Sequence, residues 1–446
     1  MSTELPSGIP VADTGTDLGP LALGDTESEI PIPTGRFSAY LQDVMSSSIV
    51  LTILAVFASL VIGGVLIAAT NADVQAASGY FLGRPADTFA AIWQSVSGAY
   101  AAIFRGGVYD FTSGNFATGI GSFLNSLNFA TPLIAAGLGI AVGFRSGIFN
   151  IGGTGIILAS AGVAGWVGFA FNLPAGIHMI IAVIAGLLAG AVWGFIVGFL
   201  KARTGAHEVI VTIMLNYVAL YLLDYLLNSP VLRDPSSNAP ISPSEKPTAI
   251  FFDLLGPRYP LNFGFILVIL ATVFCWWLLS RSSLGFKLRA VGENPRAARV
   301  AGIRINRMYV YVMVLSGILV GLAGVYQVLG KVTTGFERGI DAGIGFTAIT
   351  VALLGRSKPG GVFAAGVLFG ILQAGSYTMQ AEQGVNVNFI AVIQAVIVLF
   401  LAAPPLVRAI FRLPTPGIKP RSRSKALAAS KAGATTTPTK MGAAAK

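Results

Sequence analysis

Neutral polar side chains recur inside the apolar segments of this chain and are candidates for binding a small molecule. Amides carry both donors and acceptors, so they suit an uncharged solute rich in hydroxyl groups or ring nitrogens. The same amides could instead bond one helix to another, and the sequence leaves both roles open. We expect Asn150, Thr154, Asn216 and Tyr217 to lie along a solute path. The full set is Asn125, Asn128, Asn150, Thr154, Thr212, Asn216, Tyr217, Gln327, Gln373 and Gln394.

The sequence offers no group of residues for catalysis or for holding a cofactor. It contains no G-x-x-x-x-G-K-[ST] loop for ATP phosphates, no H-E-x-x-H motif and no G-x-S-x-G motif. Cys275 is the only cysteine, and His178 and His207 are far apart in sequence, so no metal site is expected. We therefore expect neither an enzyme nor a bound cofactor. Ionisable groups are scarce within the apolar segments, which counts against an ion-coupled carrier.

The composition is that of a membrane protein with many α-helical crossings. Hydrophobic residues make up 54% of the chain and charged residues only 11%, and the mean hydropathy is +0.75. The 54 glycines are expected where helices pack closely in lipid. The net charge of +10 is clustered outside the apolar runs, so it does not indicate a nucleic-acid partner.

We predict an all-α fold with about ten crossings between residues 49 and 403, some of them short or broken. The segments at Ile156 and Gly343 are short and glycine-rich, as an internal repeat around a central pathway would leave them. Phe89–Phe104 could lie along the membrane surface. The predicted crossings are Ile49–Thr70, Leu124–Phe144, Ile156–Phe171, Ile177–Leu200, Glu208–Leu227, Phe263–Leu279, Tyr309–Leu329, Gly343–Gly355, Gly360–Met379 and Phe389–Ala402.

The distribution of positive charge predicts which side of the membrane each connection faces. Residues 281–307 carry seven Lys/Arg against one acid, and residues 404–446 carry nine and no acid. Such segments stay in the cytoplasm, which places both chain ends inside a cell (inner) membrane. The acidic, Pro/Gly-rich residues 1–48 and the basic residues 404–446 are expected to be disordered tails. Asn228–Asn262, rich in Pro and Ser, is expected outside.

A compact helix is predicted inside the basic stretch. Asn294 is a good N-cap, Pro295 suits the first helical position, and Gly302 can take the left-handed conformation that closes a helix. Its alanines are small enough for another protein to approach. Alternatively, this is a solvated loop whose arginines only fix the topology. The residues expected to contact a partner are Asn294, Pro295, Arg296, Ala298, Arg299, Ala301 and Gly302.

Four segments are distinctive in their order and separation: GFRSGIFNIGGTG, EVIVTIMLNYVAL, AVGENPRAARVAGI and ITVALLGRSKPGGV. Together they resemble the permease subunit of a bacterial ABC importer, in the branched-chain-type superfamily and within it the nucleoside and simple-sugar group. The resemblance covers roughly residues 125–413. One difference is that the family commonly has NIG-x-E-G-Q, whereas Thr154 and Ile156 replace its carboxylate and amide here.

The resemblance implies three protein partners in addition to the lipid bilayer. They are a cytoplasmic ATP-binding subunit seated on residues 294–302, a second permease subunit of similar fold, and an extracytoplasmic substrate-binding protein. ATP bound by the first of these would drive it against the helix, tilt Phe263–Leu279 and Tyr309–Leu329, and switch access from outside to inside. The absent phosphate-binding loop agrees with an ATPase on a separate chain.

The transported solute and the energy source have alternatives. Nucleosides or simple sugars such as ribose are expected. A branched-chain amino acid is an alternative within the family, although a zwitterion would call for charged or helix-end partners. Outside the family, an ion-coupled secondary transporter would move its solute without ATP.

Overall fold

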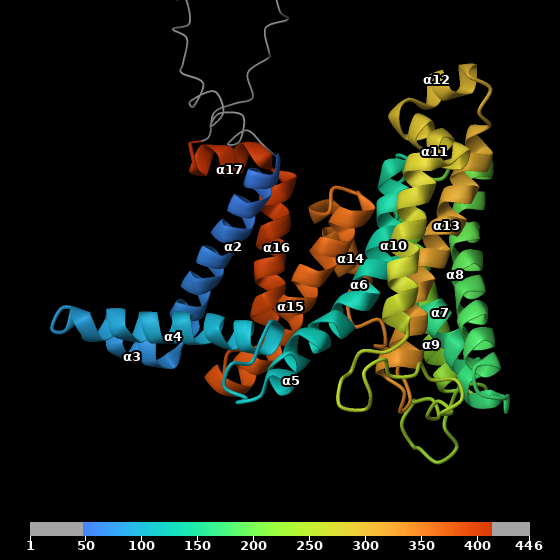
Figure 1. Ribbon diagram of the computed structural model, residues 1–446. Helices are drawn as coiled ribbons and strands as arrows, with labels where there is room; N and C mark the ends of the chain where they lie inside the picture. Colours follow the sequence, from blue (N-terminus) through green and yellow to red (C-terminus); the bar gives the residue numbers. More distant parts are fainter. Residues whose placement is uncertain (1–47, 413–446) are drawn as a thin grey trace, which may run out of the picture.

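The computed structural model describes residues 48–412, which form a bundle of helices with two distinct ends (Figure 1). One end, the α12 end, carries α11 (Ser283–Glu293), α12 (Pro295–Val300) and α17 (Pro404–Ile410). The other, the α4 end, carries α3 (Ala72–Ser78), α4 (Pro85–Gly107) and α5 (Phe116–Gly119). These described residues form no strand beyond one isolated bridge between Asp253 and Asn262. The fold is all-α, as predicted.

Eight helices of the described region are long and apolar enough to cross a membrane. They are α2 (Ser48–Thr70), α6 (Gly121–Arg145), α7 (Gly153–Ala170), α8 (Ile177–Thr204), α9 (Glu208–Leu227), α10 (Gly264–Arg281), α13 (Ile305–Tyr326) and α15 (Pro359–Gln383). Two predicted crossings are shorter apolar helices, α14 (Ile344–Leu354) and α16 (Asn388–Ala402). At 1.5 Å per residue α14 reaches about 16 Å, roughly half of a bilayer's apolar core, so it is a half-helix.

Two groups of four helices run in opposite directions around a common centre. In the first half, α6–α9, helix α6 runs toward the α12 end; in the second half, α13–α16, helix α13 runs away from it (Figure 1). Helices α6 and α13 pack together, α8 packs along α13, and α15 packs along α6. In each half the second helix, α7 or α14, begins after a break. This pairing is that of an inverted internal repeat.

Glycines allow the closest of these contacts. Gly186, Gly190, Gly194 and Gly198 recur at every fourth position of α8 and so share one face. A Cβ added to Gly190 would collide with the backbone carbonyl oxygen of Gly317 in α13. Helix pairs in lipid gain van der Waals contact from such close backbone approach.

The N-terminal helices extend the second half. Helix α2 packs against α16, and α4 packs against α15. Figure 1 shows α4 lying across the bundle rather than along it. It exposes Phe89, Trp93 and Phe104, and its predicted position on the membrane surface stays a prediction.

The predicted boundary of the basic tail is wrong. Residues Pro404–Ile410 form α17 instead of a disordered segment. Val407 is fully buried with Leu51 and Ala55 of α2, and this apolar contact holds the short helix in place. The remaining residues predicted as tails, 1–47 and 413–446, lie outside the described residues.

Candidate coupling helix and solute path

Helix α12 begins and ends at the residues that the sequence predicts. The Asn294 Oδ1 accepts a hydrogen bond from the Ala297 N–H at 3.1 Å, and Pro295 is the first helical residue. Gly302 has a φ of +80°. The Ile303 N–H donates to the Ala298 carbonyl at 3.0 Å, which is the Schellman closure. The helix is therefore capped at both ends by bonds that are local in sequence.

One side of α12 faces outward and the other packs on the protein. Ala298 is 4% exposed and packs with Ile148 and Met308 in one apolar cluster. This corrects the expectation that Ala298 is open to a partner: a helix of six residues is unstable alone and needs a buried anchor. Every residue of α12 other than Ala298 is exposed, as is Ala301 after it, and Val300 is 91% exposed.

A basic cavity of about 560 Å³ opens beside α12. It is lined by Arg299 and by residues 302–307, which include Arg304 and Arg307, and none of the lining residues is acidic. The three arginines are exposed. Guanidinium groups bind carboxylates and phosphates through paired hydrogen bonds. The cavity therefore suits an acidic ligand or an acidic protein surface.

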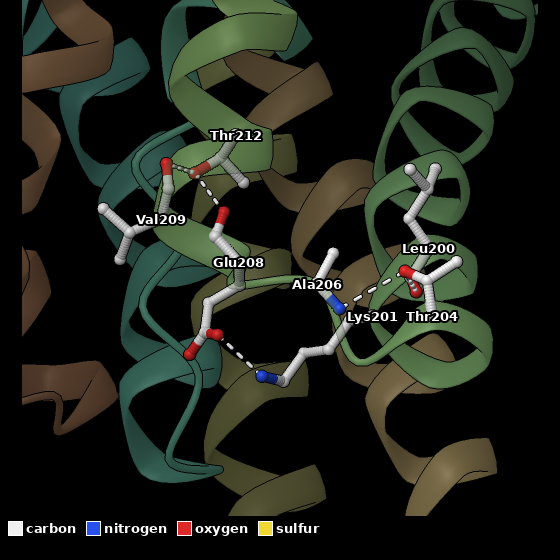
Figure 2. Close-up of polar contacts among 7 residues, drawn as sticks. All are labelled: Leu200, Lys201, Thr204, Ala206, Glu208, Val209 and Thr212. Carbon is white, nitrogen blue, oxygen red and sulfur yellow. Dashed lines mark hydrogen bonds and ion pairs between the residues drawn. The ribbon is translucent and has the colours of Figure 1, made fainter.

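An ion pair fixes the turn between α8 and α9. Figure 2 shows Lys201 reaching Glu208, with 2.6 Å between Nζ and Oε2. The Lys201 Nζ also lies 5.0 Å from the centroid of the Tyr309 ring in α13, a favourable cation–π contact. In the same view, the Thr212 Oγ1 donates to the Glu208 carbonyl at 2.8 Å. Thr212 thus bonds within its own helix.

Two of the predicted path residues form hydrogen bonds around the non-helical segment between α6 and α7. The Asn150 side chain donates to Ser316 Oγ and accepts from the Gly152 N–H, both at 2.9 Å. The Asn216 side chain accepts from the Gly155 N–H at 2.8 Å and donates to the Ile151 carbonyl at 3.0 Å. Both side chains are buried. Each amide is engaged at its oxygen and its nitrogen, so both serve to hold the broken backbone together.

The other two predicted path residues lie apart from each other. The Thr154 Oγ1 donates to Asp341 Oδ2 at 3.3 Å, where the start of α7 meets the start of α14. Tyr217 is 55% exposed on the outer surface of α9, beside Met214 and Val218. Tyr217 thus points away from the α6–α7 break, and its placement on a solute path stays a prediction. The structure therefore brings together Asn150, Thr154 and Asn216 but not Tyr217.

Sequence reasoning missed two charged residues. Lys331 ends a π-helical turn, Gln327–Lys331, that follows α13; a lone lysine at the end of an apolar run was the available signal. Glu245, in the connection between α9 and α10, is 4% exposed, and among the described residues neither carboxylate oxygen has a hydrogen-bond partner. Burial raises the pKa of Glu245 from its ordinary value of 4.5 to about 9.

His178 and Cys275, whose residue types often bind metals, are packed inside the protein. His178 is fully buried, with one ring nitrogen 2.7 Å from Thr248 Oγ1 and the other 2.9 Å from the Val167 carbonyl oxygen. Cys275 is buried and forms no disulfide. Within residues 48–412 no group of three His, Cys, Asp or Glu side chains could hold a metal ion.

Comparison with known proteins finds relatives that match most of the membrane domain. The family described as the branched-chain amino acid transport system / permease component matches residues 122–402. The guanosine ABC transporter permease protein NupP of Bacillus subtilis is 37% identical over 62% of this chain and 80% of that protein. The nucleoside ABC transporter permease protein NupB of Lactococcus lactis is 34% identical over 64% and 79%.

A third relative is named for glucose. The glucose ABC transporter permease protein TsgB13 of Haloferax volcanii is 32% identical over 61% of this chain and 73% of that protein. No solved structure matches the chain. The family match covers well over half of the sequence and includes both halves of the repeat and α12. The chain therefore belongs to the family of permease components of the branched-chain amino acid transport system, and it is the membrane-spanning permease subunit of an ABC transporter.

Proposed function

We propose that this permease imports nucleosides or simple sugars, driven by a separate ATP-binding subunit that docks on α12 in the cytoplasm. The observation that carries this proposal is α12 itself: a capped helix with an exposed outer side, beside a cavity lined by three arginines. Such a rigid, basic projection suits a partner with acidic side chains. The positive-inside rule supports a cytoplasmic α12 end.

Force on α12 would reach the break before α7 by a short route. Ala298 shares an apolar cluster with Ile148, which lies in the α6–α7 connection. At the end of α11, a Cβ on Gly292 would lie 2.8 Å from the carbonyl carbon of Ser146, so the two backbones nearly touch. Since α11 follows α10 and α12 precedes α13, a push would also tilt these two helices. The helix acts as a coupling element and contributes no reactive group.

The proposed assembly contains two permeases and an extracytoplasmic binding protein. Related permeases occur as pairs: NupP and NupQ in Bacillus subtilis, and NupB and NupC in Lactococcus lactis. This pairing supports a second permease subunit beside the present chain. The membrane-spanning fold without a phosphate-binding loop supports a separate ATPase, which would bind the ATP.

The relatives favour neutral solutes. Those at 37% and 34% identity are named for guanosine and nucleosides, and one at 32% is named for glucose. The half-buried amides Asn125 and Gln373 agree with an uncharged solute. Nucleosides and simple sugars are therefore proposed ahead of branched-chain amino acids.

Transport by the purified assembly tests this function. The permease pair, the ATPase and the binding protein would be reconstituted in proteoliposomes, and uptake of labelled guanosine, ribose and leucine would be measured with and without ATP. We expect ATP-dependent uptake of guanosine or ribose and none of leucine. Uptake driven by an ion gradient with the ATPase left out would contradict the proposal.

A further inference from the structure

An aromatic pair and a lysine meet near the α4 end, where α6, α15 and the π-helical turn converge. The Phe129 and Tyr377 rings stack with centroids 5.6 Å apart and planes at 29°. The Lys331 Nζ lies 3.7 Å from the centroid of the Phe129 ring. Tyr377 is 51% exposed, and Phe129 and Lys331 are half-buried. We call these three residues the ring–lysine cluster.

Two amides extend the cluster along its helices. Asn125 precedes Phe129 by one turn of α6, and Gln373 precedes Tyr377 by one turn of α15, so each amide shares a face with its ring. Both amides are half-buried. The backbone that carries Lys331 is held in place, because the Asn262 Nδ2 donates to the Gly330 carbonyl at 2.8 Å. Among the described residues no carboxylate pairs with Lys331.

Such a face cannot rest against lipid tails at low cost. Charged and amide groups within membrane helices almost always face a water-filled cavity or another protein. The outer face of α9 provides the contrast: its large exposed side chains, such as Met214, Val218 and Tyr221, are apolar or tyrosine. The ring–lysine cluster therefore differs in chemistry from the largely apolar outer surface of α9.

We propose that the ring–lysine cluster lines the solute path at the α4 end and contacts a solute that carries a planar ring, namely a nucleoside. The base would stack on the partly exposed Tyr377 ring, whose other neighbour is Phe129. Lys331 donates hydrogen bonds to carbonyl oxygens of the base or hydroxyl oxygens of the ribose, and Asn125 and Gln373 supply donors and acceptors. This inference rests on the proposed import function and names its solute class.

Cysteine labelling tests whether the ring–lysine cluster is exposed to water, and this test does not depend on knowing the solute. Cys275 is the only native cysteine and is buried, so Cys275→Ala gives a clean background. In the full complex, Tyr377→Cys should react with a charged, membrane-impermeant thiol reagent about tenfold faster than Tyr221→Cys, a matched exposed tyrosine on the largely apolar surface of α9. Equal rates would show that the cluster faces lipid or protein, with Lys331 reaching toward headgroups, and would overturn the inference.

Uptake by substituted permeases tests contact with the solute. Tyr377→Leu and Lys331→Met should each lower ATP-driven guanosine uptake about tenfold, as expected for loss of a ring or cation contact worth about 1.4 kcal/mol. Tyr377→Phe keeps the ring and should retain uptake, while Tyr221→Leu controls for loss of a tyrosine elsewhere. If Tyr377→Leu takes up guanosine at the wild-type rate although position 377 is labelled, Tyr377 does not contact the solute.

The two proposals fail in different ways. If the wild-type complex imports only monosaccharides with ATP, the nucleoside assignment is overturned while the import function stands. If wild-type uptake proceeds without the ATPase, the import function fails. The labelling result then still decides whether the cluster faces water.

Discussion

The two halves of the repeat close their broken helices in different ways. In the first half, the side chains of Asn150 and Asn216 make four hydrogen bonds around the α6–α7 break. In the second half, Ala342 and Gly343 adopt positive φ before α14. Each half also has two buried polar atoms with no partner among the described residues: Ser160 Oγ and Trp193 Nε1 in the first half, Gln327 Oε1 and Gln394 Nε2 in the second.

The two breaks therefore differ in their backbone: side-chain hydrogen bonds hold the first, whereas the second contains a residue with a side chain at positive φ. A positive φ at Ala342 is unfavourable for a residue with a side chain. Such features persist where surrounding contacts hold them and often accompany function. The second half also supplies Tyr377 and, at the end of the π-helical turn after α13, Lys331. We infer that the first half is the scaffold and that the second half changes during transport.

Replacing Asn216 with Leu should produce the largest loss of stability. Two buried backbone groups, the Gly155 N–H and the Ile151 carbonyl, would lose their partner, which should cost about 2 kcal/mol in the free energy of unfolding. Thermal unfolding in detergent would measure this. The adjacent Tyr217→Leu is the control and should unfold like the wild type. If Asn216→Leu and the wild type unfold at the same temperature, the first half does not act as a scaffold.

The contact between the two breaks should matter less for stability. Thr154→Val removes the single hydrogen bond to Asp341, worth about 1 kcal/mol, so uptake should change by about fivefold. Thermal stability should fall by no more than that amount. An uptake rate identical to that of the wild type would show that the two helix starts do not cooperate.

Glu245 makes the contact between the external connection and α7 depend on pH. It packs against Gly165 and Gly168, and its raised pKa of about 9 means that the folded state binds more protons than the unfolded state above pH 4.5. The free energy of unfolding should therefore fall as pH rises from about 4.5 to about 9. Glu245→Gln should flatten this dependence, which melting curves at several pH values would reveal. If the stability of Glu245→Gln depends on pH as strongly as that of the wild type, another group causes the pH dependence.

Gln394→Leu should have the smallest effect and the opposite tendency to Asn216→Leu. The wild-type Gln394 Nε2 is buried without a partner among the described residues, so an apolar side chain there loses little and should be neutral or slightly stabilising. The same thermal unfolding assay applies. A loss as large as that of Asn216→Leu would mean that the second half is held as tightly as the first, and the distinction between the halves would fail.

The sequence predicts what is local and much less of what is distant. The caps of α12 form between residues three to five positions apart, so Asn294, Pro295 and Gly302 could be assigned from their types alone. The burial of Ala298 depends on Ile148, far away in the chain, which a helix motif does not specify. Helix α9 is apolar on all sides, so nothing in its pattern indicates that Asn216 faces inward and Tyr217 outward.

The central claim is that α12 receives force from the ATP-binding subunit through its exposed side. The most direct measurement is ATP-driven uptake by Ala301→Trp in the reconstituted complex, because Ala301 is exposed whereas Ala298 is a packing residue. We expect normal membrane insertion and thermal stability, with uptake reduced at least about tenfold by the added bulk at the docking surface. Wild-type uptake by Ala301→Trp would contradict the claim that the ATPase docks on this helix.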